Sequence, residues 1–113
     1  MLRAVRIVLS VSFLAVGAAS CDSDPADEGG DTVTIDMRDF QFDPATQPID
    51  VGTTVRWVNE GNEPHNTTSA TPGEWQSADL APGQNFQREF NTAGTFQYSC
   101  TLHEGMNGTI TVQ

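Results

Sequence analysis

Four residues with metal-binding side chains stand out in this chain of 113 residues. Cys100, His103 and Met106 recur every third residue close to the C-terminus. His65 lies far upstream and is the only other histidine of the chain. Thiolate and thioether are soft ligands that suit Cu(I), and imidazole suits copper in both oxidation states; one Cys, two His and a weak axial Met form trigonal copper sites that transfer electrons. The set therefore predicts a mononuclear copper site.

Two other interpretations compete with copper. Zinc also binds Cys and His, but structural zinc sites usually close with these residue types alone, whereas here Met106 would be the fourth ligand. Alternatively, the residues are structural, because methionine commonly fills cores and a free cysteine is often a small buried hydrophobe. The neighbouring sequence favours a ligand loop. Residues 94–100 alternate and are rich in aromatic residues, as in a strand, and Gly105 and Gly108 disfavour a helix through the ligands.

The elements that would position this loop are strands. Short alternating segments are separated by turns rich in Gly, Pro and Asn, and no window has convincing helical periodicity. Such a series is typical of a β-sandwich or barrel. The expected strands occupy residues 32–38, 40–44, the part of 49–58 after a turn at Gly52, 84–90, 95–100 and 109–112. The expected core residues are Val33, Ile35, Val55, Trp57, Phe86, Phe90, Phe96, Tyr98 and Ile110, joined by Met37 as a core residue and not a ligand.

The N-terminus has the pattern of an export signal. Residues 1–20 combine a basic start, an apolar centre and a small-residue end. The apolar centre is shorter than the about 20 residues that a membrane span needs. The sequence Ala-Ala-Ser-Cys at residues 18–21 resembles the lipobox of bacterial lipoproteins, in which Cys21 would carry the lipid. The alternative is an ordinary signal peptide cleaved near Ala19, which leaves Cys21 as a free thiol. A Cys21–Cys100 disulfide is disfavoured, because Cys100 has a better use as a ligand.

Residues 21–31 are predicted to form an acidic, flexible tether, because they contain too few apolar side chains to join a core. If processing ends at Cys21, the exported chain keeps all 15 acidic residues of the sequence but only three arginines, so its net charge is near −12. This charge argues against nucleic-acid binding. It favours solubility and steers basic partners toward the protein.

The C-terminal segment resembles a known family. Residues 90–103 look like the copper loop of cupredoxins, the type 1 blue copper proteins, within the plastocyanin-like and amicyanin-like members. The short spacing from His103 to Met106 is most similar to amicyanin, since plastocyanins have a longer gap before the Met. One departure is Leu102, which stands where many members carry Pro. It removes no ligand but leaves the loop less rigid.

Two further segments complete the resemblance. Residues 55–59, followed by Pro64-His65-Asn66, are similar to the strand and loop that supply the family's first His ligand, and residues 80–86 are similar to the turn that enters the next strand. The resemblance implies a cupredoxin-like Greek-key β-sandwich of about seven to eight strands, as one domain at residues 32–113.

The resemblance also implies roles for individual residues. The residues that would bind one copper ion are His65, Cys100, His103 and Met106. Asn66 would tie the two ligand loops together through its side chain and backbone. The ring edge of His103 would reach the surface as the exit for the electron, in apolar surroundings to which Leu102 and Met106 contribute.

The predicted function is that of a membrane-tethered electron carrier that cycles copper between Cu(II) and Cu(I). The expected partner is a redox protein, such as a cytochrome or a dehydrogenase, with a basic docking face, because Glu63 and Glu104 place carboxylates beside the site. The protein is expected to be an exported monomer anchored to the outer face of the cytoplasmic membrane. An enzyme is not expected, because copper oxidases and nitrite reductases of related fold need further His-rich sites. The alternative function is storage or delivery of copper outside the cytoplasm.

Overall fold

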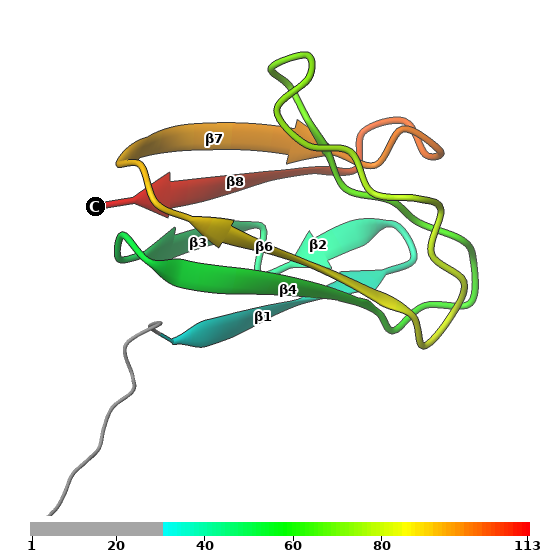
Figure 1. The fold of residues 1–113 in the computed structure, drawn as a ribbon. Helices are drawn as coiled ribbons and strands as arrows, with labels where there is room; N and C mark the ends of the chain where they lie inside the picture. Colours follow the sequence, from blue (N-terminus) through cyan, green and yellow to red (C-terminus); the bar gives the residue numbers. More distant parts are fainter. Residues whose placement is uncertain (1–30) are drawn as a thin grey trace, which may run out of the picture.

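The fold is a sandwich of two β-sheets. The structure is a computed structural model that describes residues 31–113. These residues form eight strands, which are β1 (Thr32–Arg38), β2 (Gln41–Asp43), β3 (Thr46–Ile49), β4 (Thr53–Asn59), β5 (Thr68–Ser69), β6 (Asn85–Phe90), β7 (Gly94–Ser99) and β8 (Asn107–Val112). One sheet has the strand order β2-β1-β4-β6 and the other β3-β8-β7-β5 (Figure 1). The expected all-β sandwich is confirmed.

Three predictions concern residues that lie outside this part of the chain. They are the signal peptide at residues 1–20, the lipid anchor at Cys21 and all but the last residue of the tether at 21–31. Within residues 31–113, no helix is long and apolar enough to cross a membrane.

The central strands of the first sheet, β1 and β4, run parallel, with Ile35 opposite Trp57. Between them the chain passes through β2 in the same sheet and β3 in the other sheet. Because parallel neighbours point the same way, they end at the same edge of the sheet. The turn after β1 and the loop after β4 therefore meet at one end of the sandwich. The loop after β7 lies at this end as well, away from the C-terminus (Figure 1).

Alternation along the strands identified much of the core. The expected residues that are buried are Ile35, Met37, Val55, Trp57, Phe90, Tyr98 and Ile110. Val33, Phe86 and Phe96 are only partly buried and pack against this cluster. Other buried hydrophobic residues outside the ligand loop were not among the expected core residues, namely Phe42, Ile49, Val58, Trp75, Leu80 and Val112. Trp75 and Leu80 lie in the long connection between β5 and β6, where no periodic pattern in the sequence indicates which residues are buried.

Two short strands also differ from the prediction. β3 contains Pro48, which lacks the N–H that a central strand would donate, but β3 is an edge strand and tolerates it. β5 has only two residues, which pair with Ser99 and Tyr98 of β7. A pattern of period two cannot be recognised in so short a strand.

Tyr98 anchors the strand that leads to the ligand loop. Its ring centroid lies 4.6 Å from that of Phe42 and 5.4 Å from that of Trp57. Opposite it in β8 is Gly108, where a Cβ atom would overlap the tyrosine ring. Burial raises the pKa of Tyr98 to about 12, so the phenol stays neutral. Cys100 therefore follows, two residues later, a closely packed part of β7.

Candidate metal centre

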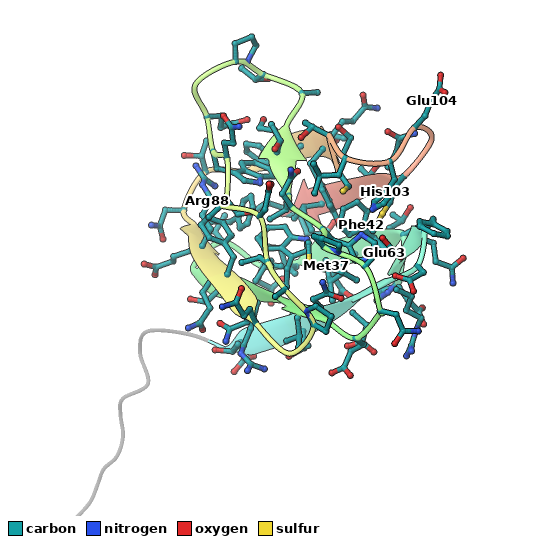
Figure 2. The ribbon with its side chains drawn as sticks, turned by 90° about the vertical axis from the view of Figure 1, so that its right-hand side faces the viewer. Met37, Phe42, Glu63, Arg88, His103 and Glu104 are labelled. Carbon is teal, nitrogen blue, oxygen red and sulfur yellow. The ribbon has the colours of Figure 1, made fainter. Side chains whose placement is uncertain are left out.

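The sequence predicted that two distant segments share one site, and the structure brings them together. One ligand atom each of His65, Cys100 and His103 lies within 4.8 Å of the others. The Nδ1 atom of His65 faces the Sγ atom of Cys100 at 4.0 Å. His65 comes from the loop after β4, whereas the other two come from the loop after β7. Figure 2 shows His103 and Glu104 on the side of the molecule opposite Arg88.

The main chain of His65 is held by Leu80. The His65 N–H donates to the Leu80 carbonyl at 3.1 Å, and the Leu80 N–H donates back at 2.7 Å. Buried Asn59, at the end of β4, supports the same loop: its Nδ2 atom donates to the carbonyls of Glu63 and Leu80, each at 2.8 Å. Its Oδ1 atom accepts from the Gly61 N–H at 2.8 Å. The main-chain position of His65 is therefore set by hydrogen bonds that need no metal.

The ligand loop after β7 is a closed turn. The Cys100 N–H donates to the Met106 carbonyl at 2.9 Å, which joins the two ends of the Cys-x-x-His-x-x-Met segment. Gly105 has a φ of +80°, a conformation that costs glycine little. The spacing of three residues that stood out in the sequence is thus the spacing of a loop that turns back on itself.

Asn66 connects the two loops. Its backbone N–H points at the Cys100 Sγ atom at 3.4 Å. Its side chain donates to the Thr101 hydroxyl at 2.8 Å and accepts from the Thr101 N–H at 3.0 Å. A second link runs from His103, whose Nε2 atom donates to the Pro64 carbonyl at 3.0 Å. Hydrogen bonds of this kind orient ligands and tune a bound metal.

The four candidate side chains differ in exposure. His65, Cys100 and Met106 are 0%, 3% and 1% exposed, whereas His103 is half-buried. The expectation that Met106 adds to an apolar surface around His103 is therefore wrong. The exposed apolar side chain beside His103 is Phe40 instead, whose ring centroid lies 4.8 Å from that of His103. Leu102, at 43% exposure, lies on the surface as expected.

The donor set fits a single copper ion. Metal–nitrogen and metal–sulfur bonds of about 2.0–2.3 Å place the ligands of one ion within about 4.6 Å of each other. The three donor atoms have nearly this spacing, and two of them already face each other at 4.0 Å. The Met106 carbonyl accepts the hydrogen bond from the Cys100 N–H, and the Met106 side chain adds a buried thioether to the loop. A thioether is a soft donor that suits copper.

Sequence analysis missed the turn between β1 and β2. Asp39 in this turn faces the far side of the His65 ring, with its Oδ1 atom 2.9 Å from Nε2. It also accepts hydrogen bonds from the N–H groups of Asn62, at 2.8 Å, and Glu63, at 3.2 Å. The Asn62 N–H is the main cause that lowers the pKa of Asp39, with help from His65 and Glu63 and against the effect of burial. The parallel pairing of β1 with β4, which no local pattern reveals, brings this turn to the site.

Comparison with known proteins identifies the family. Residues 30–113 match the family described as copper binding proteins of the plastocyanin/azurin family. The chain belongs to this family. A plastocyanin from Scenedesmus fuscus is 39% identical over 84 residues, which cover 64% of this chain and 86% of the plastocyanin. An amicyanin from Paracoccus denitrificans is 28% identical over 85 residues, which cover 72% of this chain and 65% of the amicyanin.

Solved structures agree with this assignment. An oxidised mutant of amicyanin is similar with a TM-score of 0.68 and 28% identity, over 73% of this chain and 82% of that chain. A Cu-containing nitrite reductase from Thermus scotoductus SA-01 reaches the same TM-score of 0.68 at 29% identity, but the match covers only 22% of its chain. The cupredoxin fold and one copper ion as cofactor, both expected from the sequence, are confirmed. Family membership supports a copper electron-transfer function, and proteins of this family are generally not enzymes.

Proposed function

We propose that the protein is an electron carrier and not an enzyme, and that it holds one copper ion between His65, Cys100, His103 and Met106. The observation that carries the proposal is the convergence of two imidazoles and one thiol from two loops, in a site where only His103 reaches the solvent. Copper held by these residues would supply one-electron chemistry, by alternating between Cu(II) and Cu(I).

The residues of the chain perform three tasks. Burial of His65, Cys100 and Met106 excludes water from the donors. The hydrogen bonds between the two loops keep the donors in place whatever the charge on the metal, so little rearrangement accompanies electron transfer. The half-buried ring of His103 provides the route between the site and a partner at the surface.

Optical spectroscopy and voltammetry of the copper-loaded protein test this proposal. An electron carrier should show an intense visible Cu(II)–thiolate band and should be reduced and reoxidised reversibly with the copper retained. Copper that binds without the band, or that is lost on reduction, would instead indicate storage or delivery.

The surface around His103 suggests how a partner docks. Phe40 and Leu102 are apolar and exposed, at 55% and 43%, and both neighbour His103: Phe40 through its ring and Leu102 in the sequence. Redox encounters bury little area, so a small apolar face is sufficient. Glu63 and Glu104 lie on the same side of the molecule as His103 (Figure 2) and are exposed. We infer a redox protein with basic side chains around its own docking face as the partner, with this protein acting as a monomer.

Replacement of Glu104 by Gln should slow association with such a partner severalfold at low salt, because charges at the rim of an interface mainly affect the association rate. The matched control is Glu89→Gln, which removes the same charge. Glu89 pairs with Thr54 at the start of β4, whereas the site lies beyond the end of β4. Stopped-flow kinetics with a basic cytochrome would measure both rates. Added salt should reduce the difference, since exposed charges are screened over about 8 Å at physiological ionic strength. Equal rates for the two variants would contradict acidic steering.

We also propose that the protein is exported and anchored to the outer face of the cytoplasmic membrane by a lipid on Cys21. The support is in the sequence alone, namely the signal-like residues 1–20, the small residues before Cys21 and the acidic segment that follows. Mass spectrometry of the protein from its host should find an acylated N-terminal cysteine. A chain that begins at an unmodified residue would remove the anchor and leave the copper proposal intact.

A further inference from the structure

We propose that Asp39 is a positioning residue of the copper site, which holds the buried ligand His65 in one orientation and lowers the reduction potential. The inference rests on the proposed function, because it concerns the same metal site. It goes beyond that function by assigning a role to a residue of a third segment, the turn between β1 and β2. The observation behind it is the 2.9 Å contact between Asp39 Oδ1 and His65 Nε2.

The contact belongs to a pocket made for a carboxylate. Both oxygens of Asp39 accept backbone hydrogen bonds, Oδ2 from Asn62 and Oδ1 from Glu63. Gly61 leaves room for the carboxylate, since a Cβ atom there would overlap Oδ1 and come within 2.9 Å of Cγ. The backbone of Gly61, in turn, is held by the side chain of Asn59. Asp39 thus lies against the loop that carries His65 along three consecutive residues, and a side chain at position 61 would push it out.

The contact determines which nitrogen of His65 is free to bind. A carboxylate is only an acceptor, so Nε2 must carry the proton that it donates to Asp39. A neutral imidazole then has its lone pair on Nδ1, and this is the atom that faces the Cys100 Sγ atom. His65 is fully buried, so its ring is closed off from the solvent that could otherwise replace this partner. Asp39 therefore prepares the ligand in the correct tautomer before copper arrives, as carboxylates commonly do for metal-bound histidines.

The charge of Asp39 has a second effect. Its side chain is 21% exposed, so the negative charge is only partly screened. A carboxylate behind an imidazole increases the basicity of the ligand and favours the more positively charged Cu(II) state over Cu(I). The potential is therefore lower with Asp39 than with a neutral residue in the same place.

Two variants of Asp39 separate orientation from charge. Asp39→Asn keeps an oxygen that accepts from His65 but removes the charge. It should lower the affinity for Cu(II) relative to Cu(I) by about tenfold, which raises the potential by about 59 mV for a one-electron couple. Asp39→Ala also removes the acceptor and should weaken Cu(II) binding by about 10–100-fold. The matched control is Asp43→Asn, because Asp43 carries the same charge near the same turn but pairs with Arg38.

A measurement without metal makes the test independent of copper chemistry. In the metal-free wild type, ¹⁵N NMR should find the His65 proton on Nε2, whereas Asp39→Ala should give a mixture of tautomers. Gly61→Ala displaces the carboxylate without changing residue 39 and should have the same effect on the His65 ring. A wild-type proton on Nδ1, or potentials equal in Asp39→Asn and Asp43→Asn, would overturn the role of Asp39 while the blue band of the wild type keeps the proposed function. Absence of the blue band in the wild type would overturn the proposed function itself.

Discussion

Copper-loaded protein in which Cys100 is replaced by serine is expected to lose its intense visible absorption completely. The band arises from the thiolate, and a serine hydroxyl offers copper neither the soft sulfur nor the charge of the thiolate. Cys100 is 3% exposed, and its Sγ atom lies 4.0 Å from Nδ1 of His65, so it is the thiol that faces this imidazole within residues 31–113. The measurement is the visible spectrum after addition of one equivalent of Cu(II).

The chain offers a matched control in Cys21→Ser, which removes the only other cysteine. This variant should keep the full band. Serine is nearly isosteric with cysteine, so the metal-free Cys100→Ser protein should remain folded, which circular dichroism would verify. A Cys100→Ser variant that is folded and still intensely coloured would exclude Cys100 as the ligand.

Replacement of Met106 by leucine is expected to raise the reduction potential. The thioether is the weak fourth donor of the proposed site, and its loss removes a ligand that favours Cu(II). Each tenfold loss of Cu(II) affinity relative to Cu(I) raises the potential by about 59 mV. Copper should remain bound, because His65, Cys100 and His103 are unchanged. Voltammetry of the loaded protein measures the shift.

Met37→Leu is the control for this experiment. Met37 is as deeply buried as Met106, at 0% against 1% exposure, but it lies in β1 and belongs to the hydrophobic core. Swaps between Met and Leu in a core usually cost less than about 1.5 kcal/mol, so this variant should leave both potential and spectrum unchanged. Equal potentials in the two variants would show that Met106 is core filler and not a ligand.

Local chemistry explains why the sequence was sufficient to predict most of the site. Cys100, His103 and Met106 lie on one short loop, so their spacing already implies that they are neighbours. The chain has only two histidines, and a copper site of this kind uses two, so His65 was placed in the same set. Alternation in β1, β4 and β7 likewise predicted the sandwich, because residues that share a face of a strand are two positions apart.

The rest depends on contacts between distant segments. Asp39 and His65 are 26 residues apart, and they meet because β1 and β4 are parallel neighbours with a detour through the second sheet between them. The aspartate is one of 15 acidic residues and has no distinguishing neighbour in the sequence. Trp75 is buried for the same kind of reason: its indole nitrogen donates to the Thr67 hydroxyl at 3.0 Å, a contact that only the folded connection creates.

The turn between β1 and β2 has a consequence for protein engineering. Its two adjacent residues, Asp39 and Phe40, both lie against the histidines: Asp39 contacts His65, and Phe40 packs on His103 and, at a longer centroid distance of 6.3 Å, on His65. A chimera that receives only residues 100–106 from this chain would inherit three of the four donors but neither of these neighbours. Its histidines would be supported by whatever the recipient scaffold carries between its first two strands. Transplantation of the complete site therefore requires three connections to be moved together, including one that contributes no ligand.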